Sequence, residues 1–134
     1  MLKKFTRISF LTIFAFAFFV FAQNAAAQTK KTVRFAPGAA SATVRGRVSG
    51  YAYTDYLVKA NGGQTVTVEL DGKPIAPVFS IFQPNGDNLE NAAQSNDFSG
   101  ALPVSGVYVV RVSLMRAYAR RKQSTNFTLK ITVN

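Results

Sequence analysis

The chain has 134 residues, of which 48% are hydrophobic and 16% are charged, and its formal net charge at pH 7 is +10. It contains no cysteine and no histidine. This composition excludes disulfides and anchoring through a lipidated thiol, and it removes the usual metal ligands and nucleophile–base pairs of enzymes.

Residues 1–27 have the pattern of a secretory signal peptide. Three cations precede an apolar run at residues 8–22, and Ala25-Ala26-Ala27 offers a small-x-small cleavage site. The run is shorter than the roughly 20 apolar residues that a membrane-spanning helix needs. We therefore expect export to the periplasm, cleavage near Ala27 and no stable membrane anchor.

The expected mature domain, residues 28–134, is long enough for one domain with a single core. Loss of the signal takes away three of the 16 cations and none of the six acids, so the domain keeps a net charge of +7. Such a basic exported domain favours an acidic partner: a protein surface, nucleic acid, or an anionic lipid or polysaccharide.

Short segments that alternate apolar and polar residues follow one another along the domain, as in half-buried strands. We expect strands at residues 32–35, 41–48, 56–60, 65–70, 78–82, 101–104, 107–114 and 126–133. We expect an aromatic-rich connection at 51–55, turns at 61–64, 71–74 and 84–87, and a polar connection at 88–99. Short strands at this spacing, without a long helix, predict an all-β fold: a single antiparallel β-sandwich of seven or eight strands with jelly-roll or Greek-key order.

A basic excursion, residues 115–122, separates the last two expected strands, and it contains four cations and no acid. Its good helix formers favour a helical turn, which would place Arg116 and Arg120 on one face and point Tyr118 back toward the sheet. Two neighbouring guanidiniums suit bidentate capture of carboxylates or phosphates. The excursion is therefore either a partner-binding loop or a solvated surface loop.

Several segments of the domain carry a resemblance to one known family. They are residues 41–48, Asp55-Tyr56, Asn61-Gly62-Gly63-Gln64, Ser105-Gly106-Val107-Tyr108 and, most specifically, Leu114-Met115-Arg116-Ala117-Tyr118-Ala119-Arg120-Arg121. On these segments the chain resembles the periplasmic inhibitors of g-type (goose-type) lysozyme, over about residues 41–133. The glycine turn and the Ser-Gly-x-Tyr strand entry also occur in pre-peptidase C-terminal β-sandwich domains, so the resemblance depends chiefly on the arginine-bearing run.

The resemblance implies a small exported β-sandwich whose two arginines, four residues apart, enter the acidic cleft of the lysozyme, helped by a tyrosine of a neighbouring loop. Arg116 and Arg120 match those arginines. Tyr51 and Tyr53 are both candidates for the tyrosine. We include two further members of the run, Tyr118 and Arg121, among the candidate partner-binding residues. The family usually has asparagine directly after the first arginine, where this chain has alanine.

The leading prediction is thus a periplasmic inhibitor whose partner is a g-type lysozyme, with no enzymatic activity, cofactor, metal or nucleic acid, acting as a monomer or a weak homodimer. The six acids are scattered singly, and none forms a recognisable acid–base pair. One alternative is a pre-peptidase-like module that binds polysaccharide or an exported partner. The other is a basic envelope protein that binds nucleic acid or anionic lipid without specificity.

Overall fold

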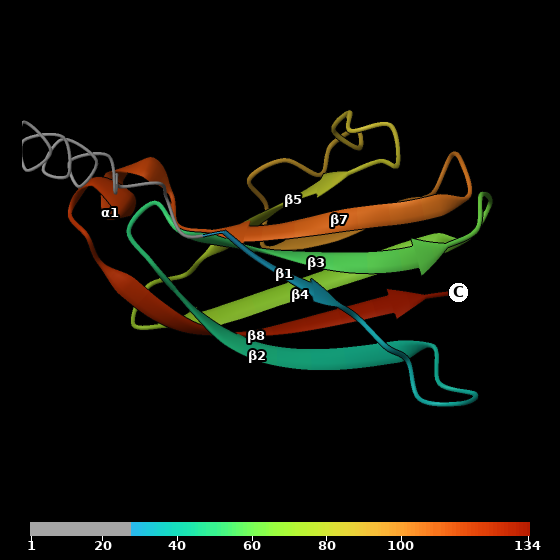
Figure 1. Ribbon diagram of the computed structural model, residues 1–134, viewed down its shortest axis with the longest axis horizontal. Coiled ribbons are helices and arrows are strands. Elements are labelled where there is room, and N and C mark those ends of the chain that lie inside the picture. The colour runs from blue at the N-terminus through green and yellow to red at the C-terminus, as the bar shows by residue number, and fades with distance from the viewer. Residues whose placement is uncertain (1–27) are drawn as a thin grey trace, which may run out of the picture.

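The computed structural model describes residues 28–134, so the predicted signal peptide lies outside the described residues. The described chain forms eight strands and one short helix, and Figure 1 shows them as two layers of strands. The elements are β1 (Gln28–Thr32), β2 (Ser41–Ser49), β3 (Tyr53–Ala60), β4 (Thr65–Lys73), β5 (Val78–Phe82), β6 (Asp97–Ala101), β7 (Gly106–Ser113), α1 (Arg116–Arg120) and β8 (Ser124–Val133).

The two sheets have four strands each, in the orders β1-β3-β7-β5 and β2-β8-β4-β6. All neighbours are antiparallel except β1 and β3, which run parallel. Successive strands lie in different sheets: the chain crosses from β2 to β3, for example, and from β7 through α1 to β8. The predicted all-β sandwich is confirmed, with the parallel β1–β3 pair as the exception to its antiparallel pairing.

The core lies between the sheets and is built from the inward residues of each alternating strand. The largest fully buried side chains are Tyr56, Phe79, Ile81, Leu129, Ile131, Val58, Val68, Val110, Val112, Thr125 and Pro77. Removing an aliphatic or aromatic side chain of this kind from water contributes roughly 1.5–3 kcal/mol. Since the alternation of apolar residues decides which face of a strand is buried, it also decides which residues remain outside.

A glycine in β2 makes room for one of these core side chains. A Cβ atom at Gly46 would lie 2.6 Å from Cζ of Phe127 and 3.1 Å from the hydroxyl of Tyr56. The rings of Phe127 and Tyr56 meet edge to face, with centroids 6.2 Å apart. Gly46 therefore allows an aromatic pair to fill the core at the point where β2 crosses it.

Two strand predictions were wrong in position. The first strand is Gln28–Thr32 and not residues 32–35. All five of its side chains are exposed, so it has no buried face to produce an alternating pattern, and backbone pairing with β3 defines it. The strand predicted at 101–104 is instead Asp97–Ala101, an edge strand paired only with β4, and Pro103 lies beyond its end.

Two predicted connections are strand in the structure. The aromatic segment 51–55 was expected to be a connection, but β3 already begins at Tyr53. The segment 71–74 was expected to turn, but β4 continues to Lys73 and stays paired with β8. In both places long-range pairing extends a strand through residues whose local composition favours a turn.

Candidate functional site

The basic excursion forms α1 and lies at one end of the sandwich, beyond the ends of the strands (Figure 1). The strand register brings a second connection to this end. Ser49, at the end of β2, pairs with Ser124, at the start of β8, while Thr54 near the start of β3 pairs with Val112 near the end of β7. The β2–β3 turn and the β7–β8 loop must therefore meet, although about 65 residues separate them in the sequence.

The predicted helical turn is confirmed, and its end has a defined geometry. The amide of Lys122 donates to the carbonyl of Ala119 (3.0 Å), and the amide of Gln123 donates to the carbonyl of Tyr118 (3.2 Å). Lys122 has φ of 55°, in the left-handed region. This pair of bonds is a Schellman motif, which usually has glycine where Lys122 stands. The loop thus reverses direction sharply at a residue that accepts backbone strain.

Apolar residues of the loop hold α1 on the body of the protein. Leu114 and Ala119 are buried, and Tyr118 is partly buried against the core, so its predicted orientation toward the sheet is confirmed. Arg116 and Arg120, in contrast, are both exposed. The helical turn is therefore amphipathic, with an apolar inner face and a charged outer face.

The four cations of residues 115–122 have no acid within ion-pairing distance in the part of the chain that the structure describes. Within residues 28–134, the single ion pair is between Arg111 and Asp55. Arg116, Arg120, Arg121 and Lys122 are all exposed. Their charges are therefore free for a partner, at the cost of mutual repulsion between neighbouring cations.

The β2–β3 turn lies directly against α1. The amide of Gly50 donates to the carbonyl of Gln123 (2.8 Å), and the position where a Cβ atom of Gly50 would lie is 3.9 Å from the carbonyl oxygen of Ala119. Tyr51, the next residue, is 57% exposed, and Met115, directly before α1, is 47% exposed. The end of the sandwich therefore carries exposed apolar side chains beside the unpaired arginines, a composition enriched in protein-binding sites.

Tyr53 lies at the start of β3 and has a different environment from Tyr51. It is half-buried, and the guanidinium of Arg111 lies over its ring, 4.1 Å from the centroid. The structure therefore brings together all six sequence-predicted residues at one end, but it distributes them between two roles. Tyr53 and Tyr118 pack against the body of the protein, while Tyr51, Arg116, Arg120 and Arg121 are exposed.

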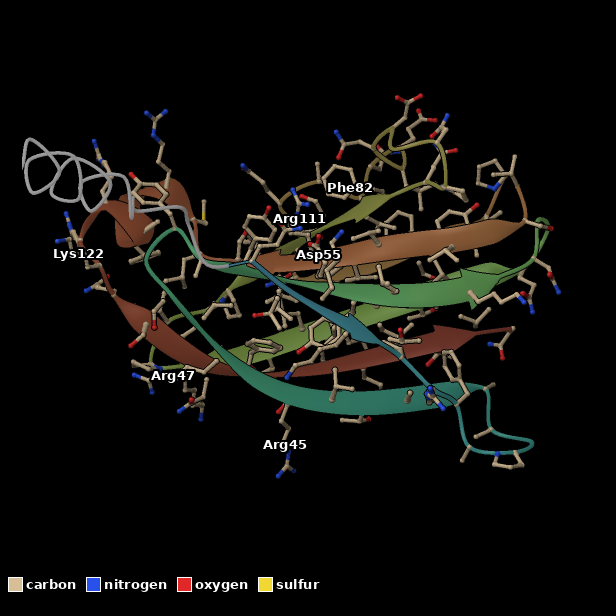
Figure 2. The ribbon with its side chains drawn as sticks, in the orientation of Figure 1. Arg45, Arg47, Asp55, Phe82, Arg111 and Lys122 are labelled. Atoms are coloured by element: carbon tan, nitrogen blue, oxygen red, sulfur yellow. The ribbon has the colours of Figure 1, made fainter. Side chains whose placement is uncertain are left out.

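Sequence reasoning missed the cluster around Arg111. Arg111 donates from Nε to one carboxylate oxygen of Asp55 (2.7 Å) and from Nη2 to the other (3.0 Å). Figure 2 shows this pair beside Phe82, whose ring centroid is 5.0 Å from the guanidinium carbon. The hydrogen bond to Asp55 raises the pKa of Arg111, with burial acting in the opposite direction. The sequence offered one unused signal, an acid, Asp55, between the aromatic residues Tyr53 and Tyr56.

The candidate residues lie away from a groove on the outer face of the other sheet. An open groove of about 720 Å³ crosses the outer face of β2, β8 and β4, and its lining includes Arg45, Arg47, Asp71 and Lys73. Figure 2 shows Arg45 and Arg47 on β2, away from Asp55 and Arg111. None of the six candidates lines this groove. Within residues 28–134, no group of three or more acidic side chains could hold a metal ion.

Comparison with known proteins decides the family. No protein-family model matches the chain. A curated protein of Escherichia coli (strain K12), the inhibitor of g-type lysozyme, is 31% identical over 113 residues, which are 81% of this chain and 84% of that protein. The chain belongs to the family of g-type lysozyme inhibitors.

Solved structures of g-type lysozyme inhibitors have the same fold as this chain. The periplasmic inhibitor PliG of Aeromonas hydrophila is 34% identical and superposes with a TM-score of 0.73, covering 82% of this chain and 100% of that one. PliG of Salmonella Typhimurium is 25% identical with a TM-score of 0.66, covering 79% and 98%. A mutant of the Escherichia coli PliG is 26% identical with a TM-score of 0.63, covering 81% and 100%.

The g-type lysozyme inhibitors in this comparison are inhibitor proteins and not enzymes, and the solved ones are described as periplasmic. That location agrees with the export signal predicted at residues 1–27. Within residues 28–134 there is no helix long and apolar enough to cross a membrane.

Proposed function

We propose that this chain is a periplasmic inhibitor of a g-type lysozyme and that it occludes the acidic active-site cleft with the α1 loop. The observation that carries the proposal is the pair Arg116 and Arg120. They lie four residues apart on one helical turn, both are exposed, and no acid of residues 28–134 forms an ion pair with either. Family membership supplies the class of partner, and the unpaired arginines supply a means of binding it.

The chemistry of the target explains why arginines suit this task. Glycoside hydrolases, including lysozymes, work with a pair of carboxylic acids on either side of the bond they cleave. A guanidinium donates two parallel hydrogen bonds to a carboxylate and keeps its charge at any physiological pH. An arginine in the cleft therefore neutralises a catalytic carboxylate and excludes the sugar, without any reaction by the inhibitor.

The way α1 is held supports tight binding. Burial of Leu114 and Ala119, together with the Schellman bonds of Gln123 and Lys122, leaves the loop few alternative conformations. Binding then costs less conformational entropy, because the loop has been ordered before the lysozyme arrives. Rigid presentation of a few charged residues is the arrangement that an occluding inhibitor needs.

The remaining candidate residues divide into contact and support. Tyr51 is exposed beside α1, and we assign it and Arg121 to direct contact with the lysozyme. Tyr53 lies under Arg111 and Tyr118 packs against the core, so we assign both to support of the contact residues. An aromatic residue next to an arginine pair is a frequent composition for an interface hot spot.

A titration against several lysozyme types tests the proposal. The purified domain of residues 28–134 is added to g-type, c-type and i-type lysozymes, and lysis of peptidoglycan is followed at two salt concentrations. We expect stoichiometric inhibition of a g-type enzyme, much weaker inhibition of the other types, and inhibition that persists at high salt. Equal inhibition of all three types that disappears with salt would show a nonspecific polycation.

A further inference from the structure

The acid of the only ion pair in residues 28–134 is buried on what should be a solvated face. Thr54 and Tyr56 point to the core from β3, so Asp55 between them points to the outer face of its sheet. Asp55 is nevertheless only 2% exposed. Burial of a carboxylate is costly unless it is paired, and Arg111, directly opposite in the β3–β7 register, supplies both hydrogen bonds.

The rings of Tyr53 and Phe82 complete the environment of Arg111. Its guanidinium carbon lies 4.1 Å from the Tyr53 centroid and 5.0 Å from the Phe82 centroid. The three strands β3, β7 and β5 thus each contribute to one cluster, in which the guanidinium is hydrogen-bonded to Asp55 and its carbon lies over two aromatic rings. Cation–π contact and bidentate pairing together fix the orientation of both partners.

The cluster lies at the roots of the two segments that form the candidate site. Tyr53 is the first residue of β3 and directly follows the turn that carries Tyr51. Arg111 is two residues before the end of β7, and the chain runs from there through Leu114 into α1. This cross-strand pair therefore joins β3 and β7 close to the points where the two segments leave the sheet.

We infer that Asp55 and Arg111 are positioning residues of the inhibitory site, which hold Tyr53 and, through it, the turn of Tyr51 in register with α1. The inference rests on the proposed function. A purely stabilising pair could lie anywhere along β3 and β7. This one lies at the end where both strands leave the sheet for the site, and it takes Tyr53 into its packing.

The test uses the domain of residues 28–134 with Arg111→Met, which removes the charge and keeps much of the side-chain length. The matched control is Arg45→Met, on the outer face of the other sheet. Two measurements are made on each variant: amide chemical shifts by NMR without any partner, and the dissociation constant for a g-type lysozyme. Circular dichroism at the working temperature establishes that each variant is folded.

We expect Arg111→Met to shift the amides of residues 49–53 and 114–123 and to weaken lysozyme binding by about 2- to 30-fold, the range reached by residues that control a site they do not touch. Arg45→Met should leave both segments unshifted. Arg111→Lys should rescue only part of the binding, because an ammonium cannot bond both carboxylate oxygens in the same plane. Tyr53→Phe, which retains the ring under Arg111, should bind nearly as wild type.

A double-mutant cycle separates positioning from general stability. In a Tyr53→Ala background, Arg111→Met should add little further loss of binding, because the ring that it positions is gone. Full additivity of the two losses, or unchanged binding by a folded Arg111→Met, would overturn the inference. If Arg111→Met fails to fold, the same cycle is run with Arg111→Lys. If the wild-type domain binds no g-type lysozyme, the proposed function fails, while the amide shifts still show whether the pair orders the two segments.

Discussion

Arginines occupy two contrasting environments in this protein. The guanidinium of Arg111 donates hydrogen bonds to the carboxylate of Asp55 and makes cation–π contacts with the rings of Tyr53 and Phe82. Arg116 and Arg120 lie only a few residues further along and have no such partner within residues 28–134.

The two environments imply different contributions of the arginines to the stability of the fold. A charge that is paired and stacked contributes to the free energy of folding, whereas an exposed unpaired charge contributes almost nothing to it. Arg116 and Arg120 are two like charges on one ordered turn, and their mutual repulsion has a small electrostatic cost. The comparison therefore predicts that mutations of the two kinds of arginine will have different measurable effects.

The largest effect is expected from the unpaired arginines on binding. Arg116→Ala and Arg120→Ala should each weaken lysozyme binding by about 2–5 kcal/mol, mainly through faster dissociation, because a desolvated carboxylate of the target loses its partner. Lysine at either position should restore only part of this loss. Binding kinetics on an immobilised g-type lysozyme measure both quantities. Binding unchanged by either substitution would remove the loop from the proposed mechanism.

The paired arginine should have the next largest effect, on stability. Arg111→Met should lower the free energy of unfolding by about 1–2 kcal/mol, since it leaves the buried Asp55 without its hydrogen bonds. The side chain of Arg111 is 35% exposed, so solvent screening limits the loss to this range. Arg116→Met is the matched control and should not change stability. Urea unfolding curves compare the two variants, and equal losses would contradict the distinction between paired and unpaired arginines.

The end of α1 allows a substitution that should improve stability. Lys122→Gly should raise the free energy of unfolding by up to about 1 kcal/mol, because glycine adopts the left-handed conformation of this position without steric cost. Arg121→Gly, one residue earlier at φ of −83°, should have the opposite sign. Thermal unfolding measures both. A destabilised Lys122→Gly would mean that the lysine makes contacts that outweigh its backbone strain.

The smallest effect is expected from a charge that belongs to neither group. Arg45 is exposed on β2 and contributes only to the overall positive charge. Arg45→Ala should slow association with the lysozyme slightly, by about 0.5 kcal/mol or less in affinity, and the difference should vanish at high salt. If Arg45→Ala weakens binding as much as Arg116→Ala does, net charge alone explains the interaction.

Local patterns in the sequence predict many of the strands and the short helix. The alternation in residues 65–70 and 126–133 predicts strands and their buried faces, because a period of two assigns every second side chain to the core. The helix formers of residues 115–122 predict α1, and their spacing predicts the common face of Arg116 and Arg120. These features depend on neighbours within a few residues, so they could be read without a structure.

What remained hidden depends on contacts between distant segments. Asp55 and Arg111 are 56 residues apart, and only the β3–β7 register places them opposite each other. The β2–β8 register, which pairs Ser49 with Ser124, brings the turn of Tyr51 against the end of α1. Tertiary packing also gives Tyr51 and Tyr53 different surroundings, which their nearly adjacent positions do not distinguish. Short-range patterns determine which residues face the core, but strand pairing determines which exposed residues meet, because it depends on the whole sheet.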